Sequence, residues 1–298
     1  MKKIIVTGSS GFIGSSFIKK FKNKYEFLGI DPLKSDQNIK SIRSNLNNLD
    51  KINVKTGKDY FLHLGAVSHD KIFKTDPINS YKTNIISTIN SIKLAAQLNV
   101  KNFIFASTEW VYGENNTSKI LKETDSVNIE NLSSDYASSK LICEQLIKKA
   151  YKNKLIKNYI ILRFGIIYGS RPRGCAVEGL FNEIYNNKDI KINGSLNNSK
   201  KYIHVDDLIN AIEKSLKLKK NETLNLCGDK LYSLMDIINV SSKILEKKNI
   251  NIIKSNEKYF NTRNPSNLKI KKILNWRPKI NLKKGIEKIF NEYYRASK

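Results

Sequence analysis

The chain has 298 residues, of which 40% are hydrophobic, and its mean hydropathy is −0.43. This composition is typical of a soluble globular protein, and no segment comes near the roughly 18 consecutive apolar residues that cross a membrane. The net charge of +26 would suit a nucleic-acid partner, but the lysines are spread over the whole chain without a nucleic-acid-binding motif. We therefore expect neither a nucleic-acid partner nor a membrane partner.

The excess of positive charge instead favours a small polyanionic substrate. The three cysteines and three histidines are scattered and show no metal-ligand spacing, which predicts reduced thiols and no metal site. Because Met1 leads directly into the first expected strand, the sequence leaves no room for a signal peptide, and we expect a cytoplasmic protein.

Short apolar strands alternate with helices through the first part of the chain. The expected strands are Ile4–Val6, Glu26–Ile30, one ending near Asn45 and Leu46, Tyr60–Leu64, Asn102–Ala106 and Ile160–Phe164. The expected helices begin at Phe12 and at Asn84, and a third helix carries Tyr136 and Lys140. This alternation predicts an α/β fold with a doubly wound parallel sheet.

The alternation weakens in the last third of the chain. The expected elements there are the strands Ile190–Ile192 and Tyr202–Val205 and the helices Leu180–Asn186, Leu208–Leu218 (capped by Asp206 or Asp207) and Leu268–Leu274. Thr223–Cys227 is expected to return to the main sheet. We therefore predict a domain of residues 1–169, completed by that strand, and a smaller interleaved C-terminal lobe formed mainly by residues 170–298.

The segment Lys2–Gly14 carries the first functional signal, because an apolar strand runs into three glycines. Gly8 permits a tight turn, Gly11 lets the backbone approach a pyrophosphate, and Gly14 allows the next helix to pack closely on the strand. Asp31 ends the following strand, where its carboxylate can bind ribose hydroxyls. The pattern predicts a dinucleotide site at the N-terminus of the helix, whose N–H groups attract phosphate.

Tyr136 and Lys140 form the second signal, because residues four apart share one face of a helix. A free phenol has a pKa of about 10 and is a poor base at neutral pH. A neighbouring ammonium group and an oxidised nicotinamide would lower that pKa. Thr108 follows a different strand end and can bind the same substrate hydroxyl, so the three residues are candidates for proton transfer.

The chain resembles the extended short-chain dehydrogenase/reductase family, specifically its nucleotide-sugar epimerases and dehydratases. The resemblance rests on the segments TGSSGFIG, HLGAVS, STEWVYG, YASSK, RFGIIYG, YIHVDD and LNWRP, which run nearly from end to end. It implies a Rossmann-type NAD-binding domain, a small lobe for a nucleotide-sugar substrate, and a homodimer formed through paired helices. It also implies that Tyr136 is the acid/base, Lys140 its electrostatic partner and Thr108 the hydroxyl-binding residue.

The motifs and the resemblance together indicate the cofactor-binding residues. Asn45 and Leu46 are implied at the adenine and Asn84 at the cofactor side of the site, while small residues after the fourth strand would let a dinucleotide lie across the strand end. The full set is Gly8, Gly11, Phe12, Ile13, Gly14, Asp31, Asn45, Leu46, Leu64, Gly65, Ala66, Asn84, Tyr136 and Lys140. Family members often carry Ala where Gly65 stands, a change that we expect to be too small to disturb cofactor binding.

The candidate substrate-binding residues come partly from the scarcity of arginine, since only seven of the 53 basic residues are arginines. If arginine is kept where its planar, bidentate geometry is needed, those in the loops of the small lobe can bind a substrate diphosphate. Lys200 occupies the place of a phosphate-binding arginine in the family. The candidate set is Ser68, Thr108, Arg171, Arg173, Lys200 and Arg263.

The type of reaction depends on the residues after Thr108. Similar 4,6-dehydratases carry two acidic residues there, whereas this chain has Glu109 followed by Trp110, which cannot act as a base. The sequence therefore favours a nucleotide-sugar 4-epimerase and keeps Glu109 as a candidate catalytic residue. A 4,6-dehydratase, a 4-ketoreductase and a non-catalytic NAD-binding protein remain as alternatives.

Overall fold

A computed structural model describes residues 1–35, 37–54, 57–68, 70–113, 119–132, 134–170, 175–192, 194–254 and 262–295. The chain divides into two compact units. Unit 1 contains residues 1–113, 126–163 and 212–224, and unit 2 contains residues 114–125, 164–211 and 225–298. The prediction was a domain of residues 1–169 completed by a strand near 223–227; in the structure residues 114–125 and 164–169 belong to unit 2, and residues 212–224 belong to unit 1.

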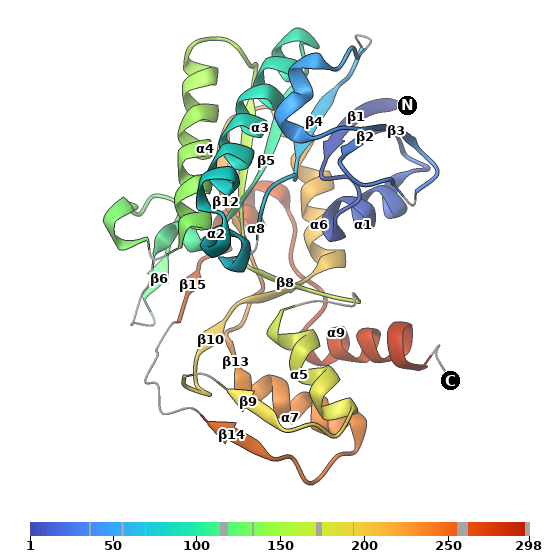
Figure 1. Cartoon of the computed structure of the whole chain (residues 1–298), viewed down its shortest axis with the longest axis vertical. Coiled ribbons are helices and arrows are strands. Elements are labelled where there is room, and N and C mark those ends of the chain that lie inside the picture. Colours follow the sequence, from blue (N-terminus) through green and yellow to red (C-terminus); the bar gives the residue numbers. More distant parts are fainter. Residues whose placement is uncertain are drawn as a thin grey trace. The chain divides into compact units, whose positions relative to one another are not determined.

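Seven strands form the main sheet. They are β1 Lys2–Thr7, β2 Tyr25–Asp31, β3 Lys40–Arg43, β4 Tyr60–His63, β5 Asn102–Thr108, β7 Tyr159–Phe164 and β12 Glu222–Leu226. Their order is β12-β7-β5-β4-β1-β2-β3, and β1 pairs in parallel with both β2 and β4 (Figure 1). The predicted doubly wound α/β sheet is confirmed, including the return of the strand expected at Thr223–Cys227.

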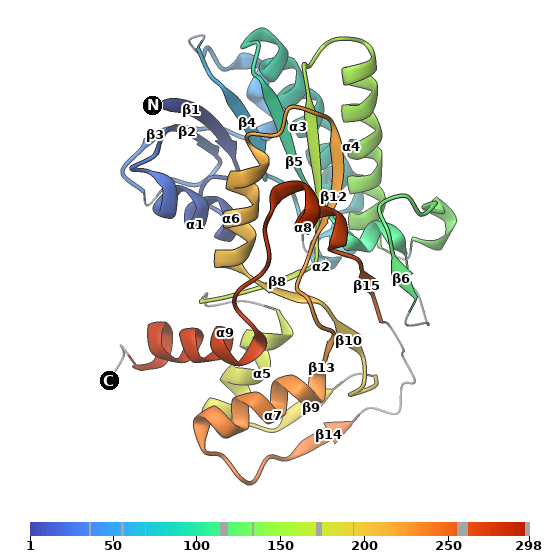
Figure 2. The same cartoon turned by 180° about the vertical axis from the view of Figure 1, so that it is seen from behind.

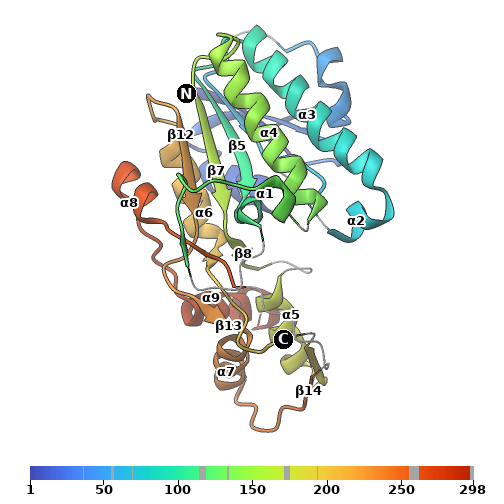
Figure 3. The same ribbon diagram turned by 90° about the vertical axis from the view of Figure 1, so that its left-hand side faces the viewer.

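Helices cover both faces of this sheet. The helices of unit 1 are α1 Phe12–Phe21, α2 Asp70–Thr75, α3 Pro77–Gln97 and α4 Asp135–Lys152, with short 3-10 helices at Leu46–Lys51, Glu109–Tyr112 and Ile129–Asn131. α3 and α4 lie side by side on one face (Figures 1 and 3), and α1 lies on the other (Figure 2). The side chains of Phe61, Phe103, Phe105 and Ile147 fill the core between the sheet and the α3–α4 pair.

The first turn of α3 lies seven residues before the predicted start at Asn84. Asp76 is the N-cap, and its carboxylate accepts a hydrogen bond from the N–H of Asn79 at 3.3 Å. Pro77 fits the first helical position because its missing N–H would have no partner there. Asn84 therefore lies in the interior of the helix, where it is 2% exposed.

Unit 2 is built from short strand pairs and a group of packed helices. The strands are β6 Ile120–Leu121, β8 Ile166–Tyr168, β9 Ile190–Ile192, β10 Ser199–Lys200, β11 Tyr202–His204, β13 Tyr232–Ser233, β14 Ile252–Lys254 and β15 Asn264–Pro265. They pair as β6–β15, β8–β11, β9–β14 and β10–β13. The helices are α5 Ala176–Tyr185, α7 Leu234–Leu245, α8 Leu268–Leu274 and α9 Leu282–Ile289, followed by a π-helical segment at Phe290–Arg295. α6 Val205–Ser215 is divided, with residues 205–211 in unit 2 and residues 212–215 in unit 1. α5, α7 and α9 pack around Val177, Phe181, Ile237 and Ile286.

α6 begins at Val205, so the two aspartates predicted to cap it lie inside its first turn instead. Asp207 is 3% exposed and accepts hydrogen bonds from the N–H groups of Lys279 and Ile280, each at 2.8 Å. Its carboxylate thus fixes the segment that leads into α9 rather than the start of its own helix. Among the helices described above, none combines the length and the apolar character that crossing a lipid bilayer requires.

Candidate active site

The glycine turn joins β1 to α1 at the carboxyl end of the sheet. Gly8 has a φ of +71°, and a Cβ atom there would lie 2.7 Å from the backbone nitrogen of Gly65. A Cβ atom at Gly14 would overlap the carbonyl oxygen of Gly8. Gly11 is the N-cap of α1 and places no side chain over the first helical turn. Side chains are thus excluded from the helix N-terminus, as a bound pyrophosphate requires.

Asp31 is held at the end of β2, beside this turn, and is 8% exposed. One carboxylate oxygen accepts the N–H of Ser10 at 3.1 Å and the other accepts the N–H of Leu33 at 2.9 Å. Each oxygen has a further lone pair, so the carboxylate can still accept a ribose hydroxyl. In the sheet register Arg43 of β3 stands opposite Asp31, and its guanidinium donates to the carbonyl of Pro32 at 3.0 Å.

The residues predicted at the adenine lie between β3 and β4. β3 ends at Arg43, earlier than predicted, because Asn45 caps the 3-10 helix and accepts the N–H of Asn47 at 3.0 Å. Leu46 is buried, and a Cβ atom on Gly65 would overlap its Cδ1 atom. In this chain the Leu46 side chain fills the space that a methyl group at position 65 would need.

Thr108 and Glu109 lie at the carboxyl end of β5. The Thr108 hydroxyl accepts the N–H of Trp110 at 3.2 Å and caps the 3-10 helix Glu109–Tyr112. Thr108 is 6% exposed, and Glu109 is fully buried. The bond from Trp110 therefore fixes the side chain of Thr108, which is the last residue of β5.

α4 carries the half-buried Tyr136 and the buried Lys140 to the same strand end. The Lys140 Nζ atom donates to the carbonyl of Ala106 at 2.8 Å and lies 4.7 Å from the ring centroid of Phe105. It lies 5.8 Å from the ring centroid of Tyr136. Burial lowers the pKa of Lys140 to about 8, so its ammonium group is still charged at neutral pH. The bond to Ala106 joins α4 to β5 two residues before Thr108.

Asn84 connects α3 to both the loop after β4 and α4. Its amide oxygen accepts the N–H of Val67 at 2.8 Å, and its amide nitrogen donates to the Val67 carbonyl at 3.0 Å and to Ser139 at 2.9 Å. Both the oxygen and the nitrogen of the Asn84 amide are therefore hydrogen-bonded to other groups of the protein. Asn84 thus joins the loop after Leu64, Gly65 and Ala66 to α4, and its predicted place at the cofactor side of the site stays a prediction.

Sequence reasoning overlooked the groups beneath the site. Ser107 donates to Glu144 at 2.6 Å, and Arg163 binds the same carboxylate through two bonds of 3.0 and 2.8 Å. Both ring nitrogens of the buried His63 are hydrogen-bonded, to Thr7 and to Thr88. His63, Ser107 and Arg163 are the first letters of HLGAVS, STEWVYG and RFGIIYG, but their partners are too distant in sequence to be recognised, and Glu144 lies in none of these segments.

Comparisons with known proteins agree with this geometry. Residues 4–227 match the NAD dependent epimerase/dehydratase family. The chain belongs to this family. It is 29% identical over 280 residues to the dTDP-D-glucose 4,6-dehydratase of Dictyostelium discoideum, covering 85% of this chain but only 62% of that protein. It is 26% identical to the UDP-glucuronate 4-epimerase of Thermodesulfobacterium geofontis, covering 96% of this chain and 94% of that one.

A solved structure adds a comparison over the whole chain. The UDP-glucuronic acid 4-epimerase of Bacillus cereus, in complex with UDP-4-deoxy-4-fluoro-glucuronic acid and NAD, superposes with a TM-score of 0.87 at 26% identity, over 99% of each chain. The predicted Rossmann-type fold and membership of the nucleotide-sugar branch of extended short-chain dehydrogenases are confirmed.

NAD is the cofactor of the family, and the residues of this epimerase/dehydratase fit it. The glycine turn keeps side chains away from the N-terminus of α1, which Phe12 and Ile13 open, and the N–H of Ser10 in that turn holds the carboxylate of Asp31. No group of three or more His, Cys, Asp or Glu side chains that could hold a metal was found in the described ranges.

We expect this family member to bind NAD more tightly than NADP by at least about tenfold, since juxtaposed like charges cost several kcal/mol. The 2′-phosphate of NADP would meet the carboxylate of Asp31, which two backbone N–H groups hold in place. Isothermal titration calorimetry with both cofactors measures the ratio. Equal affinities would show that Lys34 or Arg43 offsets the carboxylate.

The predicted substrate-binding residues fall in different parts of the chain. Ser68 is exposed in the loop after β4 of unit 1. Lys200 is half-buried in β10, opposite Tyr232 of β13, and Arg263 is 2% exposed before β15. Arg171 and Arg173 lie outside the described residues.

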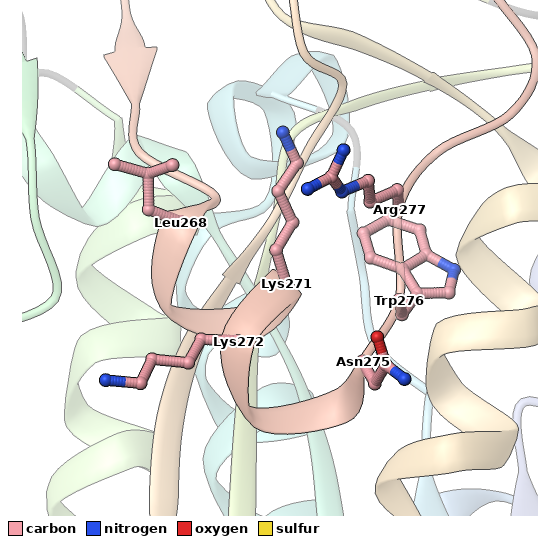
Figure 4. A pocket seen from close by; sticks show the side chains of 6 residues that line it. All are labelled: Leu268, Lys271, Lys272, Asn275, Trp276 and Arg277. Atoms are coloured by element: carbon pink, nitrogen blue, oxygen red, sulfur yellow. The ribbon is translucent and has the colours of Figure 1, made fainter.

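A cavity of about 450 Å³ lies on α8 of unit 2 (Figure 4). Its lining is Leu268, Lys271, Lys272, Asn275, Trp276 and Arg277. Lys271 forms an ion pair of 2.6 Å with Asp229, and both lysines lie in the last turn of α8, where cations stabilise the helix dipole. The cavity contains none of the residues predicted for the active site, and its charges have a structural explanation.

Proposed function

We propose that this enzyme is a nucleotide-sugar 4-epimerase. The observation that carries the proposal is the set of groups around the end of β5, where Lys140 fastens α4 to the strand that ends in Thr108. A phenol, an ammonium group and a hydroxyl on contacting elements are what a reversible proton transfer with a sugar hydroxyl needs. Trp110 stands where the related dehydratases are expected to carry a second acid.

Tyr136 is the acid and the base in this mechanism. Its phenolate takes the proton of the substrate C4 hydroxyl and returns that proton after the sugar has turned over in the site. The Thr108 hydroxyl orients the C4 hydroxyl, and the charge of Lys140 favours the phenolate. Bound NAD supplies the hydride acceptor and donor.

A 4,6-dehydratase is the second candidate, because Glu109 supplies one carboxylate beside Thr108. The Dictyostelium relative is named as such an enzyme. Glu109 is fully buried, however, and Trp110 has no acid or base function, so the proton-abstracting group of a dehydratase would have to be Glu109 itself.

Turnover in D₂O separates the two reactions. A 4-epimerase moves the C4 hydrogen as hydride and returns it, so we expect no deuterium on carbon and no net change in NADH. A dehydratase removes the C5 proton and reprotonates C6, which places deuterium at carbon. The experiment incubates a panel of nucleotide sugars with the enzyme and identifies the products by NMR; deuterium at C6 would replace the epimerase by the dehydratase.

We also propose that unit 2 binds the substrate, with Lys200 and Arg263 contributing positive charge toward its diphosphate. Arg171 and Arg173 complete this proposal from the sequence alone. The support is chemical: the chain has a large excess of lysine, yet arginine is retained at the buried position 263. A buried guanidinium suits a planar, bidentate contact with phosphate oxygens better than an ammonium group does.

A homodimer through α3 and α4 is a further part of the proposal. Ile86, Ile89 and Ile142 on these helices are half-buried and lie outside the core cluster beneath them. A second copy packed on this pair would cover them. We place the enzyme in the cytoplasm, which keeps thiols reduced, because Cys143, Cys175 and Cys227 form no disulfide.

A further inference from the structure

His63 lies below the catalytic helix and is 1% exposed. The hydroxyl oxygen of Thr7 is 2.6 Å from its Nδ1 atom, and that of Thr88 is 3.1 Å from its Nε2 atom. Ser91 also approaches Nδ1, at 3.4 Å. Both ring nitrogens are therefore hydrogen-bonded, and their partners are hydroxyl groups that can either donate or accept.

The bonds continue from Thr88 to the peptide of the catalytic tyrosine. Thr88 donates to the carbonyl of Asn84 at 2.8 Å, and the Asn84 side chain donates to Ser139 at 2.9 Å. Ser139 in turn donates to the carbonyl of Tyr136 at 2.8 Å. His63 is thus connected through α3 to the first turn of α4.

On its other side His63 reaches the cofactor-binding turn. Thr7, which binds Nδ1, is the last residue of β1 and directly precedes Gly8 with its positive φ. The Thr7 hydroxyl oxygen also accepts the N–H of Gly65 at 3.4 Å, on the loop where the dinucleotide is expected to cross. The imidazole therefore stands between the cofactor side and the catalytic side of unit 1.

The shorter bonds of Thr88 favour one direction. Thr88 has a single hydroxyl proton, and its candidate acceptors besides the imidazole are the Asn84 carbonyl at 2.8 Å and the Cys143 sulfur at 3.2 Å. With that proton on the nearer Asn84 carbonyl, the bond between Thr88 and His63 at 3.1 Å is donated by Nε2–H. Nδ1 is then the acceptor of the Thr7 hydroxyl proton. In this tautomer each of the three donors, the Thr7 hydroxyl, the Thr88 hydroxyl and the ring Nε2–H, has an acceptor.

The ring is also neutral. Burial, together with the charge of Lys140, lowers the pKa of His63 to about 3. The rings of Phe103 and Phe105 lie at centroid distances of 6.1 and 5.7 Å. A neutral imidazole with both nitrogens occupied cannot exchange protons with a substrate at working pH, so any contribution to the reaction is made by holding other groups in place.

We propose that His63 is a positioning residue, whose neutral, Nε2-protonated ring aligns the cofactor-binding turn through Thr7 and the catalytic Tyr136 through Thr88, Asn84 and Ser139. The two halves of the connection are separate, because each begins at a different ring nitrogen. The inference rests on the proposed function for its turnover measurement only; cofactor affinity and tautomer are measured without turnover.

Two substitutions at position 63 test the two halves of the connection separately. In His63→Asn the side-chain oxygen replaces Nδ1 and keeps Thr7, but nothing reaches Thr88. In His63→Gln the amide nitrogen replaces Nε2 and keeps Thr88, but Thr7 loses its acceptor. We expect His63→Asn to lower kcat about tenfold or more with little change in NAD affinity, and His63→Gln to weaken NAD binding several-fold with kcat largely kept.

Variants on α3 supply the matched controls. Thr88→Val removes the link toward Tyr136, together with the contact to the Cys143 sulfur, keeps Thr7 on Nδ1, and should reproduce the kcat loss of His63→Asn. The double variant should lose no more than either single variant, because both break the same connection. Ser91→Ala, a buried change on the same helix face at the longer contact, should leave kcat and NAD affinity unchanged.

The wild-type enzyme gives a direct test of the tautomer. The chain has three histidines, so ¹⁵N NMR of the imidazoles can be assigned with single variants. We expect protonated Nε2 and unprotonated Nδ1 for His63 from pH 5 to 9. Parallel losses of kcat and NAD affinity that follow thermal stability, or an Nδ1-protonated ring, would overturn the proposal. Absence of turnover on any nucleotide sugar would instead defeat the proposed function, and calorimetry and NMR would still decide this one.

Discussion

Tyr136→Phe should lower kcat by about 10²–10⁴-fold, the range that a positioned general acid/base contributes. The substitution removes one oxygen and keeps the ring, whose centroid lies 6.2 Å from that of Phe73. NAD affinity and stability should therefore hardly change. Steady-state kinetics on the nucleotide sugar that the wild type converts, combined with calorimetry for NAD, measures both quantities.

Tyr81→Phe is the matched control for this substitution. Its ring also packs on Phe73, at 5.7 Å, and its hydroxyl donates to Asp135 at 3.0 Å on the same helix that carries Tyr136. Loss of this bond should leave kcat nearly unchanged. Near-normal turnover by Tyr136→Phe would remove the tyrosine from the mechanism.

Arg163→Met should destabilise the protein by about 3–5 kcal/mol, because it leaves the carboxylate of Glu144 buried without its partner. Arg163 is 3% exposed, and Glu144 is fully buried. Two hydrogen bonds join them, and Lys148 at 3.8 Å is the more distant cation. Urea denaturation should show a lower midpoint with an unchanged slope.

Two controls accompany the arginine variant. Lys101→Met removes an exposed ion pair with Asp59 and should leave the urea midpoint unchanged. Adding Glu144→Gln to Arg163→Met removes the unpaired charge, keeps an acceptor for Ser107 and should recover most of the loss. If the arginine variant unfolds at the wild-type midpoint, the ion pair has no net role in stability.

Local patterns were enough to predict the sheet and the placement of the candidate site residues on its elements. The strand followed by Gly8, Gly11 and Gly14 predicted the turn between β1 and α1, and the four-residue spacing of Tyr136 and Lys140 placed both on one helix. These features depend on neighbours in sequence, which is why they are visible without a structure. The start of α3 was also visible, since Asp76 and Pro77 form an ordinary N-cap pair, but the prediction placed it at Asn84.

Contacts between distant residues could not be read in the same way. Nothing near Gly65 in sequence indicates that Leu46 would occupy the space of a methyl group there. His63 finds its partners 56 and 25 residues away, and Glu144 lies 19 residues from Arg163. The bond from Asn84 to Ser139 could not be predicted for the same reason, since Ser139 is on another helix.

Unit 1 is built from three separate segments of the chain, and this has a consequence for its folding during synthesis. Its last segment, residues 212–224, supplies Glu213, which accepts the hydroxyl of Tyr25 at 2.6 Å, and the carbonyls of Leu216 and Leu218, which accept the Asn102 amide at 2.8 and 2.7 Å. During synthesis β7 is therefore an uncovered sheet edge until residue 224 has left the ribosome. The nascent cofactor domain has to wait for much of its neighbour to be translated, which favours chaperone contact over independent folding of the N-terminal half.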